Sequence, residues 1–360
     1  MRWFVLSFVE TADLLLALNA LPGVGPGRLA RLGADDLAAL GADPAAAWSR
    51  LGRGAPPPPR REALRALARA ERERAAEVGA RILVRGGPDW PEAVEALDHP
   101  PPVLHAWGDV GLLSSPRPRV AVVGARACTG YGRAQAERFG AGLAAGGAVV
   151  VSGGARGVDR HAMEAARDLG GPVVAVLGSA LDRPYPPEAA PLFRALAAEG
   201  GLVVSEFPYG TRPRAGNFPR RNRVLAAVSD ALLVVQATRR SGSMNSAGWA
   251  VTLGREVFAL PGPVDCEASR GPHALLREGA ALAEGPEELL AVLSGEPTAE
   301  ERGEEPPLLA ALAAGDRTLD ELAAVLGAPP EAVRLELVEW ELAGRVVRRA
   351  GGTYHRLGPR

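Results

Sequence analysis

VVVSGGARGVD, residues 149–159, joins an unbroken apolar run to a glycine-rich turn and the first residues of a helical pattern. The apolar run recurs along the middle of the chain, at 120–123, 173–177, 202–204, 232–235 and 257–260. Alanine-rich amphipathic stretches separate these runs, at 133–145, 161–169 and 220–228 among others. Apolar strands that alternate with helices predict an α/β fold whose parallel sheet is covered on both faces.

The two ends of the chain differ from this pattern. Residues 11–75 read as helical, and a tight turn at 23–25 is similar to a helix-hairpin-helix. Near the other end, the stretch 284–305 holds eight Glu and one Arg, which indicates an acidic linker. Three short helical patterns and two strand-like runs follow it, in the order of a winged helix. The expected segments are a helical domain at 1–80, the sheet domain at 81–290, a linker at 291–305 and a winged helix at 306–360.

All 41 basic residues are arginine, since the chain contains no lysine, and the formal net charge is -1. A Walker A loop and a Schiff-base enzyme both require a lysine, so both classes are excluded. Two distant cysteines, Cys128 and Cys266, and scattered histidines offer no metal-ligand spacing, so we expect neither a metal nor a cofactor. The cysteine pattern fits a cytoplasmic protein, and the apolar residues 1–9 are too few to span a membrane.

Glycine, serine and arginine follow several of the predicted strands, at the edge of the sheet where ligands bind. Glycines let a backbone come close to a phosphate, although in any single loop they equally serve to turn the chain. A dinucleotide site is a rival interpretation, but Gly130 and Gly132 lack a third glycine, and no acidic residue at the end of the strand 149–152 can hold a ribose. The candidate anion-binding residues are Gly124, Arg126, Ser152, Gly153, Gly154, Arg156, Gly178, Ser179, Ser241 and Gly242.

The segment 211–223, TRPRAGNFPRRNR, has five arginines, one phenylalanine and no acidic residue. We interpret it as a loop for single-stranded nucleic acid, because arginines neutralise the backbone and an aromatic ring stacks on bases. Three of the four asparagines of the chain, at 217, 222 and 245, lie in these loops. The alternative is a solvated loop around a buried phenylalanine. The candidate residues of the segment are Asn217, Phe218, Arg220, Arg221, Asn222 and Arg223.

Charge also bears on the winged helix, whose third helix reads a DNA groove in proteins of this type. Here that helix is acidic, with Glu331, Arg334, Glu336, Glu339 and Glu341 as its charged residues. Phosphate repels such a helix, so we expect it to contact protein. The wing residues that remain as DNA contacts are Arg345, Arg348 and Arg349.

Taken together, these motifs resemble the DNA-processing protein A family, called DprA or Smf. The segments that carry the resemblance include VAVVGARACTGYG, VVVSGGARGVDRHAMEAA, AVLGSALDRPYPPE, SEFPYGTRPRAGNFPRRNR and RSGSMNSAGWAVTLGREVFALPGPVD. Residues 319–357 resemble the winged helix of the family, and the N-terminal segment is similar to its sterile-alpha-motif-like (SAM) domain. The resemblance implies a Rossmann-like sheet core and a protein that binds single-stranded DNA and is not an enzyme.

The resemblance also implies partners and a site. Family members form homodimers through the Rossmann-like domain and load the RecA recombinase onto incoming strands during natural transformation. Carried over by motif, the DNA pocket of this chain consists of Gly124, Arg126, Ser152, Gly153, Phe218, Arg221, Asn222, Arg223, Ser241 and Gly242.

Two other functions stay open at this point. The first is a hydrolase of nucleoside monophosphates on the related Rossmann-like fold, although the corresponding stretch 240–248 has no acidic residue for catalysis. Asp159 and His161 imitate an acid/base pair, but no nucleophile accompanies them, and we expect Asp159 to cap or orient a loop. The second is a scaffold or regulator that acts through the winged helix alone.

Overall fold

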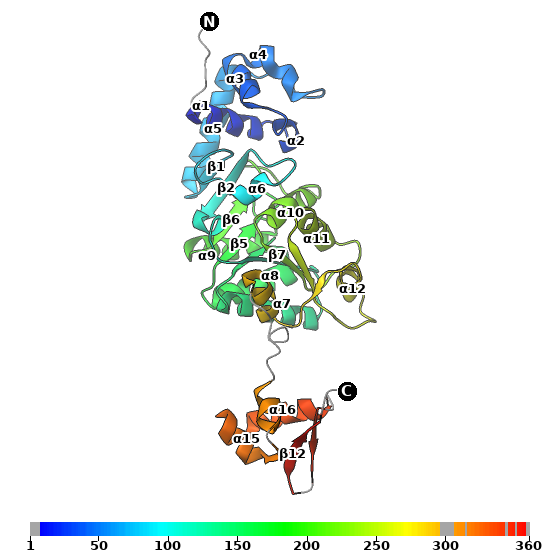
Figure 1. Cartoon of the computed structure of the whole chain (residues 1–360). Coiled ribbons are helices and arrows are strands. Elements are labelled where there is room, and N and C mark those ends of the chain that lie inside the picture. The colour runs from blue at the N-terminus through cyan, green and yellow to red at the C-terminus, as the bar shows by residue number, and fades with distance from the viewer. Residues whose placement is uncertain (1–7, 296–305, 314, 343–344, 350, 358–360) are drawn as a thin grey trace. The chain divides into compact units, whose positions relative to one another are not determined.

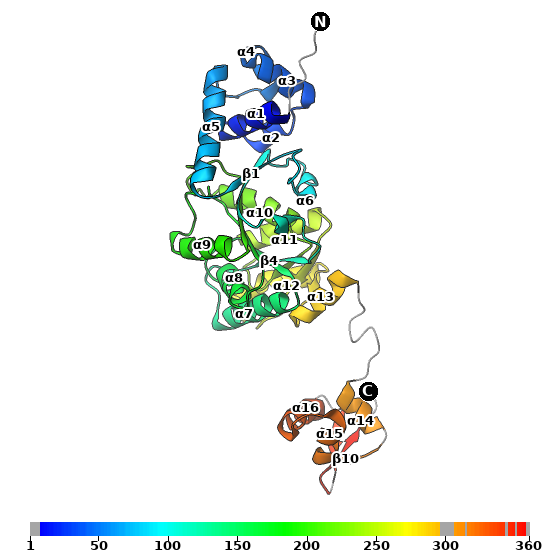
Figure 2. The same cartoon turned by 90° about the vertical axis from the view of Figure 1, so that its left-hand side faces the viewer.

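The computed structural model describes residues 8–295, 306–313, 315–342, 345–349 and 351–357. The chain divides into two compact units, Met1–Glu296 and Pro297–Arg360. Figure 1 and Figure 2 draw the whole chain from two directions. The N-terminal helices and the sheet thus belong to one unit, where the sequence predicted separate domains at 1–80 and 81–290. Helix α13, Pro286–Ser294, includes the first residues of the expected linker, and 296–305 lie outside the described residues.

The first unit is built on a nine-stranded sheet in the order β1-β2-β6-β5-β4-β3-β7-β8-β9. The six predicted apolar strands are all present, and together with β9 they run parallel. The sequence did not predict β1 and β2 at one edge, where β2 pairs antiparallel with β6 and β1 pairs antiparallel with β2. The strands are β1 Arg81–Val84, β2 Val103–Gly108, β3 Arg119–Val123, β4 Val149–Ser152, β5 Val173–Val176, β6 Leu202–Ser205, β7 Ala231–Val234, β8 Glu256–Ala259 and β9 Ala281–Leu282.

Helices cover both faces of the sheet, as apolar strands without polar alternation require. In β3, Val120 and Val122 pack into the apolar core of one face, and Ala121 and Val123 into that of the other. The helices of the first face are α7 Gly130–Ala145, α8 Val158–Asp168, α9 Ala190–Ala198 and α13. Those of the second face are α6 Glu92–Glu95, α10 Asn217–Ala227, α11 Gly242–Thr252 and α12 Arg270–Arg277.

Helix α10 corrects the interpretation of the arginine-rich segment as a loop. The helix begins at Asn217, so the second half of the segment is helical. With 3.6 residues per turn, Arg220 and Arg223 lie on one face, and Arg221 points in a different direction. The orientation of the helix therefore decides which arginines meet the solvent.

The N-terminal helices pack around an apolar core of their own, which includes Leu16, Leu18, Leu40 and Leu51. Val103 of β2 belongs to the same core, and Ile82 of β1 packs against it. This shared core explains why the helical region is part of the first unit. Its helices are α1 Phe8–Ala20, α2 Pro26–Leu29, α3 Ala34–Ala42, α4 Pro44–Ala47 and α5 Arg61–Glu77.

The second unit has the parts of a winged helix, in the predicted order. Thr318 and Glu321 form a capping box at the start of its second helix, as their spacing indicates. A short strand before this helix, which the sequence did not predict, joins the hairpin in the sheet order β10-β12-β11. The elements are α14 Pro307–Ala313, β10 Arg317–Thr318, α15 Leu319–Leu326, α16 Pro330–Leu342, β11 Val346–Arg348 and β12 Thr353–Arg356. Across the described ranges, no helix is both long and apolar enough to cross a membrane.

Candidate nucleic-acid interface

A cavity of about 200 Å³ lies where the chain leaves β3, β4 and β7. β4 pairs with one side of β3 and β7 with the other, so the connections diverge here. Open α/β sheets bind their ligands at such a switch point. The cavity is lined by Val123, Gly124, Ala125, Arg126, Ala155, Asp159, Phe218, Arg221, Asn222, Leu225, Ser241, Gly242, Ser243 and Ser246.

Seven of the sixteen predicted site residues line this cavity. They are Gly124, Arg126, Phe218, Arg221, Asn222, Ser241 and Gly242. They come from three connections that are distant in sequence, those after β3, β6 and β7. The sheet therefore brings together residues that were predicted from the ends of separate strands. The Arg126 guanidinium lies 5.2 Å from the centre of the Phe218 ring, and the Tyr185 ring lies 5.5 Å from it on a tilted plane. A cation beside an aromatic stack is an arrangement that suits a nucleobase and its phosphate.

Asp159, at the start of α8, ties two of the glycine loops together. Its carboxylate accepts hydrogen bonds from the backbone N–H groups of Gly124 at 3.3 Å, Gly153 at 3.2 Å and Ala155 at 3.4 Å. Burial raises the pKa of this carboxyl, and the nearby Arg221 opposes that shift. The bonds of Asp159 match its expected role of orienting a loop, because its oxygens hold the two turns in register.

Arg221 is buried against the floor of the same cavity. Its guanidinium donates to the carbonyl oxygen of Gly153 at 2.6 Å, to that of Val176, and to the side-chain oxygen of Asn222 at 3.1 Å. Burial lowers the pKa of Arg221 to about 10. Its hydrogen bonds are therefore made within the protein, and what it offers a ligand is mainly a positive field beside Asp159.

Arg223 does not line the cavity, although the family motif predicts it in the DNA pocket. It is 7% exposed, pairs with Glu206 and donates to the carbonyl oxygen of His99 at 2.9 Å. Arg220 pairs with the same carboxylate at 2.9 Å and lies 4.8 Å from the ring centre of Phe207. The acid that was missing from the segment 211–223 thus comes from the end of β6.

Glu206 is the residue that sequence reasoning missed. It is 2% exposed and follows the predicted strand 202–204 after one serine. An acidic residue directly after a buried strand is itself a signal, because a carboxylate at that position needs a cation from elsewhere in the fold. Glycines mark the ends of β3, β4 and β5, whereas the residues that directly follow β6, Glu206 to Tyr209, include none.

The remaining predicted residues support the cavity or lie beside it. Ser152 is buried and donates to the carbonyl oxygen of Val122 at 2.7 Å. Gly178 lies under the Phe218 ring, where an added Cβ would come within 2.7 Å of the ring. Ser179 is buried next to it, and its carbonyl oxygen accepts from Ser205 at 2.8 Å. Outside the cavity, Arg156 is exposed and paired with Glu188.

Two further predicted residues, Gly154 and Asn217, do not line the cavity. Gly154 has a φ of +67°, and a Cβ there would lie 2.6 Å from Phe193, so its role is conformational. Asn217 lies at the start of α10 and donates to the carbonyl oxygen of Arg212 at 3.3 Å. Two exposed arginines, Arg239 and Arg240, directly precede Ser241, which lines the cavity.

Comparison with known proteins agrees with the fold and the motifs. The family model described as DNA recombination-mediator protein A matches residues 81–294, and the DprA winged helix domain matches residues 292–352. The Smf protein of Escherichia coli is 39% identical over 277 residues, which cover 73% of each chain. A putative DNA processing protein DprA of Mycobacterium tuberculosis is 38% identical over 317 residues, 79% of this chain and 81% of the relative.

Two solved structures are similar as well. DNA processing protein A of Streptococcus pneumoniae superposes with a TM-score of 0.63 at 27% identity, over 79% of this chain and 98% of the other. The structure that concerns the single-stranded DNA binding mode of the Helicobacter pylori protein has a TM-score of 0.54 at 33% identity, over 60% and 96%. With a Rossmann-like core, a winged helix and these matches over most of its length, the chain belongs to the DNA recombination-mediator protein A family, whose curated members are named DprA and Smf.

Proposed function

We propose that this protein binds single-stranded DNA at the cavity, and that it loads RecA onto the bound strand during natural transformation and recombination. The observation that carries the binding proposal is the Arg126 guanidinium beside the Phe218 ring, both on the cavity wall. The ring offers a stacking surface for a base, and the guanidinium neutralises a neighbouring phosphate. The similar protein of Helicobacter pylori, whose structure concerns single-stranded DNA binding, supports the same proposal.

RecA loading rests on membership of a family that is described as a recombination mediator. We propose in addition that the protein acts in the cytoplasm as a homodimer through its Rossmann-like domain, as the resemblance implies.

The test of binding is a charge reversal at an exposed cavity residue. Arg126→Glu is expected to weaken binding to an oligo-dT strand tenfold or more, because it replaces an attraction to phosphate by a repulsion. The matched control is Arg117→Glu, at an exposed arginine just before the amino end of β3. Equal affinities of the two variants would refute the cavity as the binding site.

Arg223→Glu is unsuitable for this purpose, although it follows from the motif. The side chain is buried against Glu206, so reversing its charge would unfold the region rather than probe DNA binding.

For RecA loading, the readout is DNA-dependent ATP hydrolysis by RecA on a strand already coated with single-strand-binding protein. The wild type is expected to accelerate it, and Arg126→Glu is not.

The enzyme alternative has weak support at this site. The stretch 240–248 carries no acidic residue, and the carboxylate of Asp159 is occupied by three backbone N–H groups. We therefore propose a protein without catalytic residues. Release of a free base from AMP or CMP by the purified protein would overturn this.

A further inference from the structure

A second, larger depression lies between the N-terminal helices and the sheet region. It has a volume of about 910 Å³. One wall consists of residues 19–25 and of α5, and the other of residues 207–220. Both walls belong to the first compact unit. We call this depression the interdomain groove, after the helical and sheet domains that the sequence predicted on its two sides.

Arginines dominate the charge of the interdomain groove. Arg74 on α5 and Arg212 and Arg214 on the opposite wall are exposed, and no ion pair joins them to the other described residues. Arg220 also lines the groove and is the member that pairs with Glu206. An exposed cation without a counter-ion on each wall attracts a polyanion that lies between them.

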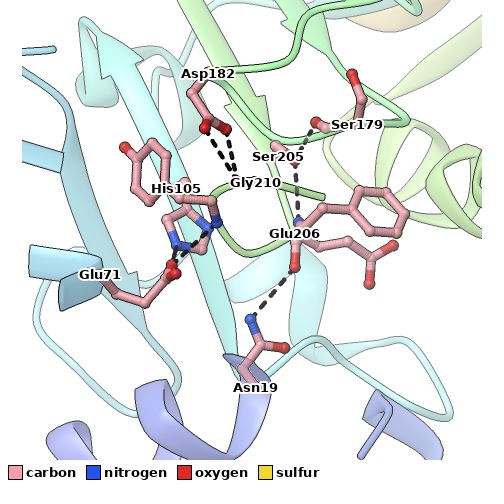
Figure 3. A network of polar contacts seen from close by, with 10 residues as sticks. Asn19, Glu71, His105, Ser179, Asp182, Ser205, Glu206 and Gly210 are labelled. Atoms are coloured by element: carbon pink, nitrogen blue, oxygen red, sulfur yellow. Dashed lines mark hydrogen bonds and ion pairs between the residues drawn. The ribbon is translucent and has the colours of Figure 1, made fainter. Parts of the chain in front are cut away.

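The acidic residue of the lining does not offset these arginines. Glu71 is 5% exposed, and its carboxylate accepts from the His105 ring at 2.9 Å and from the Tyr209 backbone N–H at 3.2 Å. Figure 3 shows the Glu71 carboxylate directed at the His105 ring, beside the loop that carries Gly210. The carboxylate therefore serves the structure, and the solvent-facing side chains of the groove remain cationic.

The same polar contacts hold the two walls together. The Asn19 amide, at the end of α1, donates to the backbone carbonyl of Glu206 at 3.5 Å, and Glu71 of α5 accepts from the Tyr209 N–H. Within the opposite wall, Asp182 accepts from the Gly210 N–H at 2.9 Å and fixes that loop (Figure 3). A Cβ added at Gly210 would lie 3.4 Å from the Arg74 guanidinium, so Arg74 reaches across to the opposite loop. These contacts make the groove a built feature of the unit.

The first turns of α10 lie between the groove and the cavity. Asn217 and Arg220 line the groove, whereas their neighbours Phe218 and Arg221 line the cavity. A strand whose base stacks at Phe218 therefore needs to cross only this turn to enter the groove.

We propose that the interdomain groove is a second phosphate-binding subsite for the single strand that leaves the cavity, with the N-terminal helical region as one wall. The inference rests on the proposed function and extends it. The helical region then contributes directly to the length of DNA that the protein covers.

The experiment compares two lengths of oligo-dT on the full-length protein. A strand of about 5 nucleotides, near the lower end of known site sizes, fills the cavity alone, and one of about 20 reaches the groove. The variant Arg74→Ala/Arg212→Ala/Arg214→Ala is expected to weaken binding of the long strand about tenfold and to leave the short strand within twofold. The slope of log K against log salt concentration for the long strand is expected to become shallower by about 2, because each of the three lost phosphate contacts contributes roughly 0.7 on a single strand.

The matched control replaces three exposed arginines outside both sites, Arg117, Arg194 and Arg277, by alanine. It is expected to behave as wild type. Equal losses on both strand lengths, or no loss on the long strand, would overturn the inference. Failure of the wild type to bind either strand would instead refute the proposed function, so the two failures are distinct.

The role of the helical wall is tested by Arg74 alone. Arg74→Glu is expected to weaken only the long strand, several-fold, and Arg65→Glu, at an exposed position on the same helix, serves as its control. If Arg74→Glu binds the long strand as wild type does, the helical region is not a wall of the subsite.

Discussion

Helices α10 and α16 carry opposite charges, and they expose them differently. α10 holds Arg220, Arg221 and Arg223, of which the last two are buried and their charge is met by Asp159 or Glu206. α16 is acidic, and its glutamates are exposed or half-buried. The comparison teaches that a run of charge in a sequence is not yet a charged surface. Only the side chains that the fold leaves without a partner create a field outside the protein.

Apolar exposure separates the two helices further. On α16, the side chains of Leu335 and Leu342 are 71% and 84% exposed, and Val338 lies between them at 46%. The same helix faces solvent with Glu331 and Glu339. An acidic helix with exposed leucines repels phosphate and suits contact with protein. This agrees with the expected protein-binding role of the winged helix, which stays a prediction.

The comparison between the buried charges of α10 and the exposed charges of α16 predicts its largest effect on stability. Arg221→Ala is expected to lower the free energy of unfolding by about 3–5 kcal/mol, because it leaves the buried carboxylate of Asp159 without its cation. Glu339→Ala, at an exposed position of α16, is expected to change it by less than about 0.5 kcal/mol. Urea denaturation measures both. A similar small effect for the two variants would show that Arg221 is not an internal charge.

The next effect is on DNA affinity. Phe218→Ala is expected to remove a stacking interaction of about 1–3 kcal/mol, which corresponds to roughly 5- to 150-fold weaker binding of oligo-dT. Phe218→Trp keeps an aromatic face and is expected to restore most of the affinity. Fluorescence anisotropy with a labelled strand provides the measurement. If Phe218→Trp binds as poorly as the alanine variant, the ring acts through packing on Gly178 rather than by stacking.

A smaller effect concerns the pH dependence of the winged helix. The hydrogen bond from His355, with help from Arg349, holds the pKa of Asp316 below its ordinary value of 3.8. A carboxyl with a lowered pKa stabilises the fold above its ordinary pKa, and this is lost as the pH falls through the lowered value. Asp316→Asn is therefore expected to speed hydrogen exchange in 345–349 and 353–357 at neutral pH. The difference from wild type should fade in acid, and a difference that persists there would contradict the assignment.

The smallest expected effect comes from removing the second unit. Deletion of residues 297–360 is expected to change the affinity for oligo-dT by less than about twofold, because α16 is acidic and phosphate repels it. A gel shift with the shortened protein, compared with Phe218→Ala in the full chain, measures this. A loss as large as that of Phe218→Ala would mean that wing residues such as Arg348 hold the strand.

Much of the fold was predictable because its signals are local. The six apolar runs became parallel strands, and the capping box at Thr318 formed as its spacing indicated. The edge strands β1 and β2 were not predicted, since β2 joins the sheet by pairing with β6, about a hundred residues further along, and β1 joins it only through β2. Of the seven predicted residues that line the cavity, four follow the strands β3 and β7 and three lie on α10. They were predictable because the topology of a parallel sheet brings its strand ends to one edge.

The sequence by itself determined the alternation of strands and helices, the glycines at the strand ends and the absence of lysine. Each of these is a property of neighbouring residues or of composition. Only the tertiary structure decided that Arg126 faces the cavity while Arg223 meets Glu206, and that α5 supplies Arg74 to the interdomain groove. The reason is that neighbours in space decide whether a charged side chain is paired inside the protein or faces solvent, and those neighbours come from distant parts of the chain.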